Sequence, residues 1–246
     1  MDIILYNILI GFCCLFFGYI FGSIPNGVII GKIFYKKDPR QEGSKNSGGT
    51  NVGRLFGKKA GLAVIILDMF KSVIPTLIIY FVLKYSGLNE FLIQQFGQGF
   101  YNAGVLFIYL TPIGVAIGHC WPLFANFKGG KTVAVFCGFA IMSSWALIVL
   151  GAIVFFGVLK IKKYVSLASM MTATIATAFT WLMYGLNFII SNEYQNIIMW
   201  GNGNFLIMGW EFAMAISVIA ILLIYRHKAN IVRLIKHQEN KIKWMK

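Results

Sequence analysis

Six long apolar stretches constrain the fold of this chain more than any other feature. They are Leu5–Ile30, Leu62–Leu83, Ala103–Ile117, Thr132–Leu159, Tyr164–Asn192 and Phe205–Tyr225. Each stretch approaches or exceeds the length that a helix needs to cross a hydrocarbon core of about 30 Å. Charged residues make up only 12% of the 246 residues, whereas an ordinary soluble domain has about 25%. The sequence therefore predicts an all-α, polytopic integral membrane protein.

The positive charges of the chain are sorted into a few segments. Eight Lys or Arg residues lie between Lys32 and Lys59, and most of the others gather at Lys128 and Lys131, at Lys160–Lys163 and from Arg226 onward. The connection Ser191–Asn204 has none. Cytoplasmic loops of membrane proteins carry an excess of Lys and Arg, which explains most of the net charge of +14. This pattern indicates a cell-membrane protein with basic cytoplasmic loops, and it requires no nucleic-acid partner.

Charge parity decides how the stretch Thr132–Leu159 crosses the membrane. Its 28 residues are long for one helix and short for two. If it crossed once, the basic cluster after it and the basic C-terminal tail would lie on the outer side. A hairpin of two short or tilted helices, turning near Ser143–Ala146, keeps every basic loop in the cytoplasm. We therefore expect one domain over residues 1–246, with about seven membrane helices, an outer N-terminus and a cytoplasmic C-terminus.

Three polar segments on the basic side of the membrane carry the chemical information. We call them the first island (Ser23–Arg54), the second island (His119–Lys131) and the third island (Arg226–Glu239). The first begins inside an apolar stretch, where Pro25 cannot donate to a helical ladder and so interrupts the helix. The outer connections, by contrast, are predicted to be plain loops. Three islands that face one compartment predict a composite site near the inner membrane surface.

The first island contains a glycine-rich, cationic loop, GSKNSGGTNVGR, at residues 43–54. Glycines allow successive backbone N–H groups to turn toward an anion. The loop adds neutral donors and two cations, and Arg40 just upstream is a fork-shaped donor that suits a phosphate. We interpret the loop as a site for a phosphoryl group. A flexible cytoplasmic loop that is rich in glycine for its turns is the alternative.

The second island contains GGKT at residues 129–132 but is not a P-loop, because Ala125 stands where that pattern needs a glycine. Gly129–Thr132 is nevertheless predicted to open a helix, and a helix N-terminus that carries a lysine attracts phosphate. His119, at the cytoplasmic end of its helix, could act as a general base or a phosphate ligand. A plain C-terminal cap is the alternative for His119.

The third island repeats polar residues every three positions, at His227, Asn230 and Arg233. A helix would place them along one face, although a solvated basic tail beside anionic lipid is the alternative. Within the membrane, Asp68 and Lys71 lie three residues apart, so we expect them to neutralise each other against neighbouring helices. A role in bracing the site is the alternative.

Taken in order, the islands resemble the motifs of the bacterial acyl-phosphate-dependent glycerol-3-phosphate acyltransferases, which are integral membrane enzymes of phospholipid synthesis. The resemblance is carried by Ser23–Gly27, by Asp38–Arg40 with Gly43–Arg54, by Gly118–Lys131 and by His227–Leu234. The loop is similar to the family's GSGNxGATNVxR, the second island to GHxxPxFxxFKGGKG, and the third to HxxNIxRL. Leu67-Asp68 with Lys71 also resembles a family pattern. The chain departs from the family at five positions: Lys45, Thr132 and His237 replace glycines, Gly49 replaces alanine, and Val135 replaces threonine.

The resemblance implies transfer of a fatty acyl group from acyl phosphate to the 1-hydroxyl of glycerol 3-phosphate. It implies an acyl-phosphate site of Ser23, Gly43, Ser44, Asn46, Gly48, Thr50 and Asn51. It implies a glycerol-3-phosphate site of Arg40, Lys128, Lys131 and Arg233. The predicted catalytic residues are His227, Asn230 and His119, although an activated donor needs no protein base and a substrate phosphate could accept the proton.

The implied partners are the two substrates, membrane lipid and, transiently, the enzyme that makes acyl phosphate. We expect no cofactor and no metal, because the four cysteines lack metal-ligand spacing and the chain lacks the multi-aspartate signature of the CDP-alcohol phosphotransferases. The rival hypothesis is a membrane transporter of a phosphorylated solute. A transporter needs polar residues along a path to the outer side, and the outer connections here are nearly devoid of charge.

Overall fold

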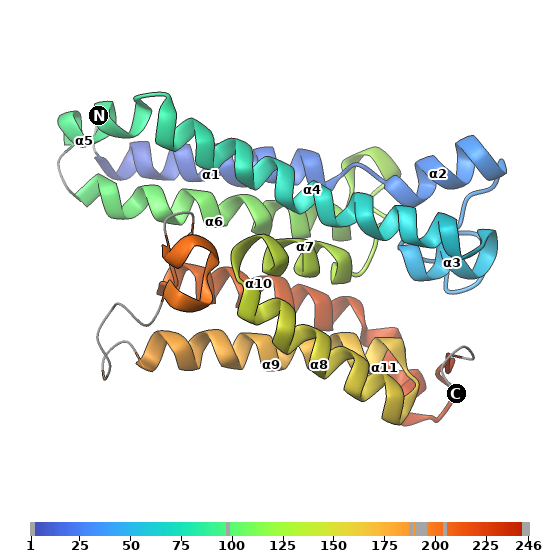
Figure 1. Ribbon diagram of the computed structural model, residues 1–246. Coiled ribbons are helices and arrows are strands. Elements are labelled where there is room, and N and C mark those ends of the chain that lie inside the picture. The colour runs from blue at the N-terminus through green and yellow to red at the C-terminus, as the bar shows by residue number, and fades with distance from the viewer. Residues whose placement is uncertain (1–2, 97–98, 187–188, 190–195, 204–205, 243–246) are drawn as a thin grey trace. The chain divides into compact units, whose positions relative to one another are not determined.

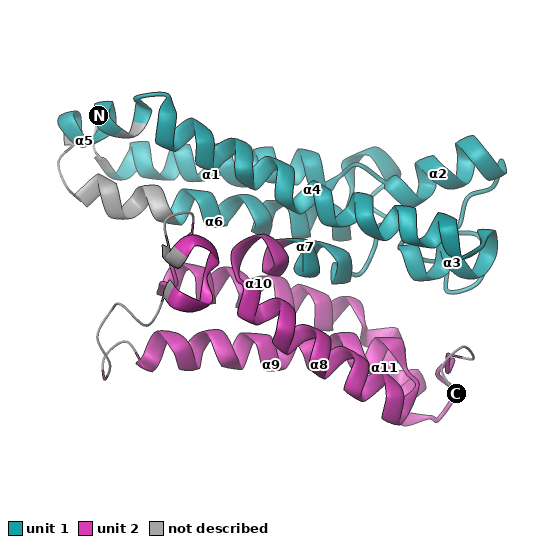
Figure 2. Ribbon diagram, viewed as in Figure 1, with its two compact units in different colours: residues 1–138 teal, residues 139–246 magenta. Residues whose placement is uncertain are grey.

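The structure is a computed structural model that describes residues 3–96, 99–186, 189, 196–203 and 206–242 (Figure 1). Among these residues every regular element is helical, as the apolar stretches predict. They form two compact units, residues 1–138 (unit 1) and residues 139–246 (unit 2) (Figure 2). The expectation of a single domain stays a prediction.

Unit 1 is organised around two long helices that approach each other closely. Its elements are α1 (Ile3–Gly22), α2 (Asn26–Tyr35), α3 (Gly49–Phe56), α4 (Lys58–Tyr85), α5 (Leu88–Phe96), α6 (Gly99–Cys120), the 3-10 turn η1 (Leu123–Ala125) and the beginning of α7 (Val133–Ser143). Helices α1, α4 and α6 run side by side (Figure 1). The predicted interruption of the first apolar stretch is confirmed, because α1 ends at Gly22 and α2 begins at Asn26.

Helices α1 and α6 meet through two glycine pairs spaced four residues apart, Gly18 with Gly22 and Gly114 with Gly118. A Cβ atom added at Gly18 would lie 2.1 Å from the carbonyl oxygen of Thr111, and one at Gly118 would lie 2.2 Å from that of Tyr19. Small residues at this spacing allow membrane helices to pack backbone against backbone. The four glycines therefore set the distance between the two helices whose C-terminal ends lead to Ser23 and His119.

We expect Gly18→Ala to destabilise the protein by about 1–3 kcal/mol, because one added methyl group must push α1 away from the α6 backbone. Thermal unfolding of the purified protein in detergent measures the effect. The matched control is Gly157→Ala in α8, where an added Cβ has no atom within 4 Å and alanine favours the helix. Equal unfolding temperatures for the two variants would contradict the close α1–α6 contact.

Unit 2 begins within α7 and continues with the helices that follow it. They are α8 (Trp145–Lys162), α9 (Val165–Leu186), the 3-10 turns η3 (Asn196–Ile198) and η4 (Trp200–Gly203), α10 (Trp210–Arg226) and α11 (Lys228–Ile235). Helices α8 and α10 both pack on α9. The predicted turn in Thr132–Leu159 is confirmed as a break at Ser144. Its hydroxyl accepts a hydrogen bond from the backbone N–H of Leu147 at 3.3 Å and donates to the carbonyl of Ile198 at 2.6 Å.

Within the part of the chain that the structure describes, five helical segments are long and apolar enough to cross a membrane, and a sixth is obtained if α10 and α11, bent by 56°, form one span. The expected number of about seven includes α7, whose 11 residues reach only about 16 Å. The protein is therefore an integral membrane protein with multiple helical spans. One expectation is wrong: the connection after Lys84 is not a plain loop, because its apolar residues fold into the helix α5.

Candidate functional site

The glycine-rich loop between α2 and α3 is closed around one buried side chain. The Asn51 amide donates to the carbonyl oxygens of Pro39, Glu42 and Asn46 at 2.7, 3.2 and 3.0 Å. Its oxygen accepts the backbone N–H of Ser44 at 2.8 Å. Asn51 is only 2% exposed, so it lies inside the loop and holds it in shape. Asn51 therefore shapes the loop, and its contact with a phosphate stays a prediction.

The beginning of α3 supplies backbone donors that the loop itself does not use. The side chain of Asn46 accepts the N–H of Gly48 at 2.8 Å and so turns the chain into the helix. Within the described residues, the N–H groups of Ser47, Gly49 and Thr50 donate to no protein acceptor. Unpaired donors at a helix N-terminus favour an anion. Ser47 lies buried at the base of this turn, where its carbonyl oxygen packs against Gly27.

Helix α3 can lie this close to α4 because both helices carry glycine where they meet. A Cβ atom added at Gly61 would lie 2.6 Å from the Cα atom of Gly53. One at Gly49, where the family usually has alanine, would lie 2.5 Å from the side chain of Ile65 and 2.6 Å from the carbonyl oxygen of Gly61. This departure from the family therefore matches the close packing of α3 on α4 in this chain.

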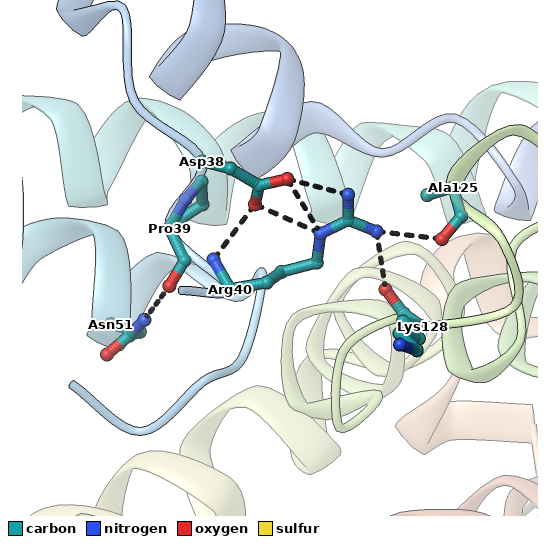
Figure 3. Close-up of polar contacts among 6 residues, drawn as sticks. All are labelled: Asp38, Pro39, Arg40, Asn51, Ala125 and Lys128. Atoms are coloured by element: carbon teal, nitrogen blue, oxygen red, sulfur yellow. Dashed lines mark hydrogen bonds and ion pairs between the residues drawn. The ribbon is translucent and has the colours of Figure 1, made fainter. Parts of the chain in front are cut away.

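Arg40 joins the first island to the second (Figure 3). Its Nε and Nη2 atoms donate to the Asp38 carboxylate at distances between 2.7 and 3.2 Å, and its Nη1 atom donates to the carbonyl of Ala125 at 2.7 Å. A longer bond of 3.4 Å reaches the carbonyl of Lys128. The side-chain hydrogen bond from Arg40 holds the pKa of the Asp38 carboxyl below its usual range. These contacts indicate that Arg40 clamps the two islands together, and its contact with a phosphate stays a prediction.

The second island folds back against the end of α6. The N–H of Gly130 donates to the carbonyl of His119 at 2.9 Å, and the Asn46 side chain donates to the carbonyl of Gly129 at 3.4 Å. A Cβ atom added at Gly130 would lie 1.9 Å from Nε2 of His119, so only glycine allows the imidazole ring to lie against this backbone. Lys131 follows directly and is half-buried, while Lys128 is exposed. The segment Gly129–Thr132 leads into α7, as predicted.

A buried ionic cluster lies beneath the two islands. Asp68 and Lys71 on α4 form an ion pair of 3.0 Å, as their spacing predicts, and Nδ1 of His119 lies 3.9 Å from the same carboxylate oxygen. Lys71 also donates to the carbonyl of Ile24 at 3.1 Å, and Asn26 donates to Asp68 at 3.0 Å. Ser23, which directly precedes Ile24 in the sequence, is fully buried. Its hydroxyl donates a hydrogen bond to the carbonyl of Tyr19 at 2.8 Å.

The third island, in unit 2, converges on Glu239. Its carboxylate accepts hydrogen bonds from Asn230 and Arg233 at 2.7 Å each and from Ser166 at 3.0 Å. Burial raises the pKa of the Glu239 carboxyl, but the hydrogen bonds from Arg233, Asn230 and Ser166 outweigh burial and hold the pKa below its usual range. His227 lies at the bend between α10 and α11, with Nδ1 2.8 Å from the carbonyl oxygen of Leu223. Asn230 and Arg233, three residues apart on α11, therefore lie on one face of the helix and bind the same carboxylate.

The three glycine replacements all lie where glycine is the favoured residue. Lys45, Thr132 and His237 have φ angles of 53°, 63° and 54°. Residues other than glycine rarely adopt this left-handed region, and a β-branched residue such as threonine is an outlier there. Thr132 is also fully buried, with its hydroxyl 3.5 Å from the Cys120 sulfur. The backbone of this chain is therefore strained at all three positions.

We expect Lys45→Gly to raise the unfolding free energy by about 0.5–1 kcal/mol, because glycine removes the steric conflict of a left-handed residue. Lys45 is exposed, so little packing is lost. Thermal unfolding in detergent checks the expectation. Gln41→Gly, an exposed position of the same loop without a positive φ, is the matched control and should lower stability. If both variants are destabilised alike, the strain at Lys45 is not significant.

The structure brings together the predicted residues of unit 1. The Gly43–Asn51 loop, Arg40, Lys128 and His119 are linked by the contacts given above. The predicted His227, Asn230 and Arg233 belong to unit 2. Sequence reasoning missed the roles of Asn26, Asp38 and Glu239 as partners of other site residues. Only Asp38, two positions before Arg40, had a signal in the sequence, because neighbouring opposite charges often pair.

The comparisons with known proteins cover nearly the whole chain. Residues 12–237 match the family described as Glycerol-3-phosphate acyltransferase. The chain is 39% identical over 233 residues to the glycerol-3-phosphate acyltransferase of Staphylococcus haemolyticus, covering 94% of this chain and 97% of that protein. It is 39% identical over 228 residues to that of Listeria monocytogenes and 36% identical over 226 residues to that of Ureaplasma urealyticum. Each match covers 92% of this chain, with 94% of the Listeria protein and 87% of the Ureaplasma protein.

Comparison with solved structures also points to glycerol-3-phosphate acyltransferases. The fold is similar to the crystal structure of PlsY (YgiH), an integral membrane glycerol 3-phosphate acyltransferase, in its glycerol 3-phosphate form. The TM-score is 0.68 at 28% identity, over 95% of this chain and 96% of that one. The lysophosphatidic acid form of PlsY matches with a TM-score of 0.67 at 29% identity, over 95% of each chain. By sequence and by fold, this chain belongs to the glycerol-3-phosphate acyltransferase family.

Proposed function

We propose that this protein moves a fatty acyl group from acyl phosphate to the 1-hydroxyl of glycerol 3-phosphate. The products are 1-acylglycerol 3-phosphate (lysophosphatidic acid) and phosphate. The observation that carries the proposal is the junction of the first two islands, where Arg40 and Asn46 hold the glycine-rich loop against Ala125–Gly129. A reaction between two phosphorylated substrates needs two neighbouring anion sites. Membership of the family and the named forms of PlsY support the same reaction.

The loop residues are proposed to hold the phosphate of the acyl donor. The donors are the free N–H groups at the start of α3 together with Ser44, Asn46 and Thr50, in the loop that Gly43, Gly48 and Asn51 shape. Ser23 is a further proposed member of this site. Acyl phosphate is a mixed anhydride with a good leaving group. The main tasks of the protein are therefore to position the carbonyl carbon and to neutralise the departing phosphate.

Glycerol 3-phosphate is proposed to bind through Lys128 and Lys131, with Arg40 and Arg233 adding positive charge. The hydroxyl oxygen attacks the acyl carbonyl carbon, an ester C–O bond forms, and the anhydride C–O bond breaks with its electron pair on the phosphate. The hydroxyl proton passes to a substrate phosphate or to a histidine. His227, Asn230 and His119 are the proposed catalytic residues, and no step requires a metal or a cofactor.

The proposed site faces the cytoplasm of the cell membrane. The basic residues of all three islands support this orientation through the positive-inside rule. The acyl chain would remain among the apolar helices while its phosphate lies at the membrane surface. The soluble enzyme that makes acyl phosphate is the proposed transient partner.

The test uses the purified full chain in lipid nanodiscs with palmitoyl phosphate and labelled glycerol 3-phosphate. We expect labelled lysophosphatidic acid from palmitoyl phosphate and none from palmitoyl-CoA. Lys131→Ala should lower kcat/KM by at least about 100-fold, since it removes a charge that stabilises the transition state. Lys59→Ala, an exposed cation at the start of α4, is the matched control and should retain activity.

The transporter hypothesis predicts a different result. Proteoliposomes would then accumulate labelled glycerol 3-phosphate while the nanodisc assay yields no acylated product. That combination would overturn the acyltransferase proposal.

A further inference from the structure

Asp68 and Lys71 of the ionic cluster have no part in the proposed reaction, although together with His119 they form the most buried charged group in unit 1 among the described residues. Asp68 is 3% exposed, and Lys71 and His119 are each 6% exposed. Charges at such depth are costly and persist where neighbouring groups fix them. The cluster also lies at the level where α1 is interrupted, because its partners are Ile24 and Asn26.

Asp68 is the centre of this cluster. Its Oδ1 atom accepts the side-chain N–H of Asn26 at 3.0 Å, and it lies 3.0 Å from Nζ of Lys71 and 3.9 Å from Nδ1 of His119. Three separate segments, the α1–α2 break, α4 and the end of α6, therefore meet at one carboxylate oxygen. Simple neutralisation of Lys71 would require only one of these contacts.

The cluster also adjoins both glycine-rich segments. A cavity of about 10 Å³, no larger than a single water molecule, is shared by all three. Its lining includes Asp68, Lys71 and His119 together with Ser47 and Gly129, which lie in the glycine-rich segments of the first and second islands.

His119 is the link between the cluster and the second island. One ring nitrogen, Nδ1, faces Asp68, and the other, Nε2, lies against the Gly130 backbone. The carbonyl of His119 also accepts the N–H of Gly130 at 2.9 Å. The orientation of this imidazole therefore sets the path of Gly129–Gly130 and, through it, the position of Lys131.

We propose that Asp68 is a positioning residue for the glycerol-3-phosphate site, acting through His119 on the Gly129–Lys131 segment. The inference rests on the proposed function and adds a role that ion-pair neutralisation alone does not supply. Removal of the Asp68 charge should therefore weaken recognition of glycerol 3-phosphate even when the partner charge on Lys71 is removed as well.

The experiment separates the two roles with a pair of variants. Asp68→Asn leaves Lys71 buried and unpaired, so it should lower the unfolding temperature and activity together. The double variant D68N/K71Q has no unpaired charge, so its unfolding temperature should return close to that of the unmodified protein. Glu90→Gln, an exposed carboxylate on α5, is the matched control.

We expect the double variant to keep a KM for glycerol 3-phosphate that is raised by about 10-fold or more, because small misplacements of positioning groups have effects of this size. The KM for palmitoyl phosphate should stay within about 2-fold, since the loop of residues 43–51 keeps the Asn51 contacts. A double variant that regains the normal KM for glycerol 3-phosphate, or one that loses affinity equally for both substrates, would overturn the proposal.

A second readout does not depend on activity. In protein with ring-¹⁵N histidine, the His119 signals, assigned with His119→Gln, should shift in D68N/K71Q relative to the unmodified protein. Unchanged His119 signals would show that Asp68 does not orient the ring. If the unmodified protein makes no lysophosphatidic acid, the proposed function fails, while the histidine spectra still decide whether Asp68 positions His119.

Discussion

Asn51→Asp should abolish almost all acyl transfer while changing the size of the side chain hardly at all. The aspartate would lose the three amide hydrogen bonds and would turn a carboxylate oxygen toward the carbonyls of Pro39, Glu42 and Asn46. Each lost bond is worth about 1 kcal/mol, and repulsion between buried oxygens adds to the loss. A loss of about 2.7 kcal/mol already lowers kcat/KM by 100-fold, so we expect activity below about 1% in the palmitoyl phosphate assay.

The control for Asn51→Asp must carry the same change of charge in the same loop. Gln41→Glu does so at an exposed position, and it should retain most of its activity. If Gln41→Glu is as damaged as Asn51→Asp, the effect comes from negative charge near the substrates. If both are fully active, the Asn51 contacts do not organise the acyl-phosphate site.

Among substitutions in unit 2, we expect Glu239→Ala to have the largest effect on stability and activity. It removes the carboxylate that binds Ser166, Asn230 and Arg233. Removing one member of a hydrogen-bonded ion pair costs about 2 kcal/mol of stability when the remaining groups are partly exposed. We therefore expect a lower unfolding temperature and a large loss of activity. The matched control is Glu211→Ala in the first turn of α10, which should have a smaller effect on activity.

The lowered pKa of Glu239 predicts that the protein loses stability at acidic pH. Its pKa in the folded protein lies below the usual value of 4.5. A group with a depressed folded pKa stabilises the protein above its unfolded pKa, and this contribution is lost as the pH falls through the folded pKa. Unfolding temperatures measured from pH 6 down to pH 3 should therefore fall for the unmodified protein and fall less for Glu239→Gln. Parallel curves would contradict a stabilising role of the Glu239 charge.

Several features of the site follow from local patterns in the sequence. The break before Asn26 is predicted by Pro25, and the break at Ser144 by charge parity. The pairing of Asp68 with Lys71 follows from their spacing of three residues on a helix. Each of these predictions is confirmed. The break at Pro25 and the Asp68–Lys71 pair depend on residues close together in the sequence, and the break at Ser144 follows from the sidedness of the basic loops.

Other features could not be found in this way. The sequence motif includes Asn51, but it does not reveal that its amide closes the loop onto Pro39, which is 12 residues away. Arg40 was expected to bind phosphate, yet its guanidinium also reaches Ala125, which is 85 residues away. The left-handed backbone at Lys45 and Thr132 is likewise invisible from residue identity, because neither residue type favours it.

The sequence alone determined the class of this protein and the kind of chemistry it performs. A helix satisfies its own backbone hydrogen bonds, so apolar length and the side of the basic residues are enough to predict helices and their orientation. Only the tertiary structure decided which groups of the motifs face one another. The Asn51-centred loop, the Arg40 clamp and the Asp68 cluster depend on contacts between segments brought together by glycine-mediated helix packing, and such contacts leave no periodic trace in the sequence.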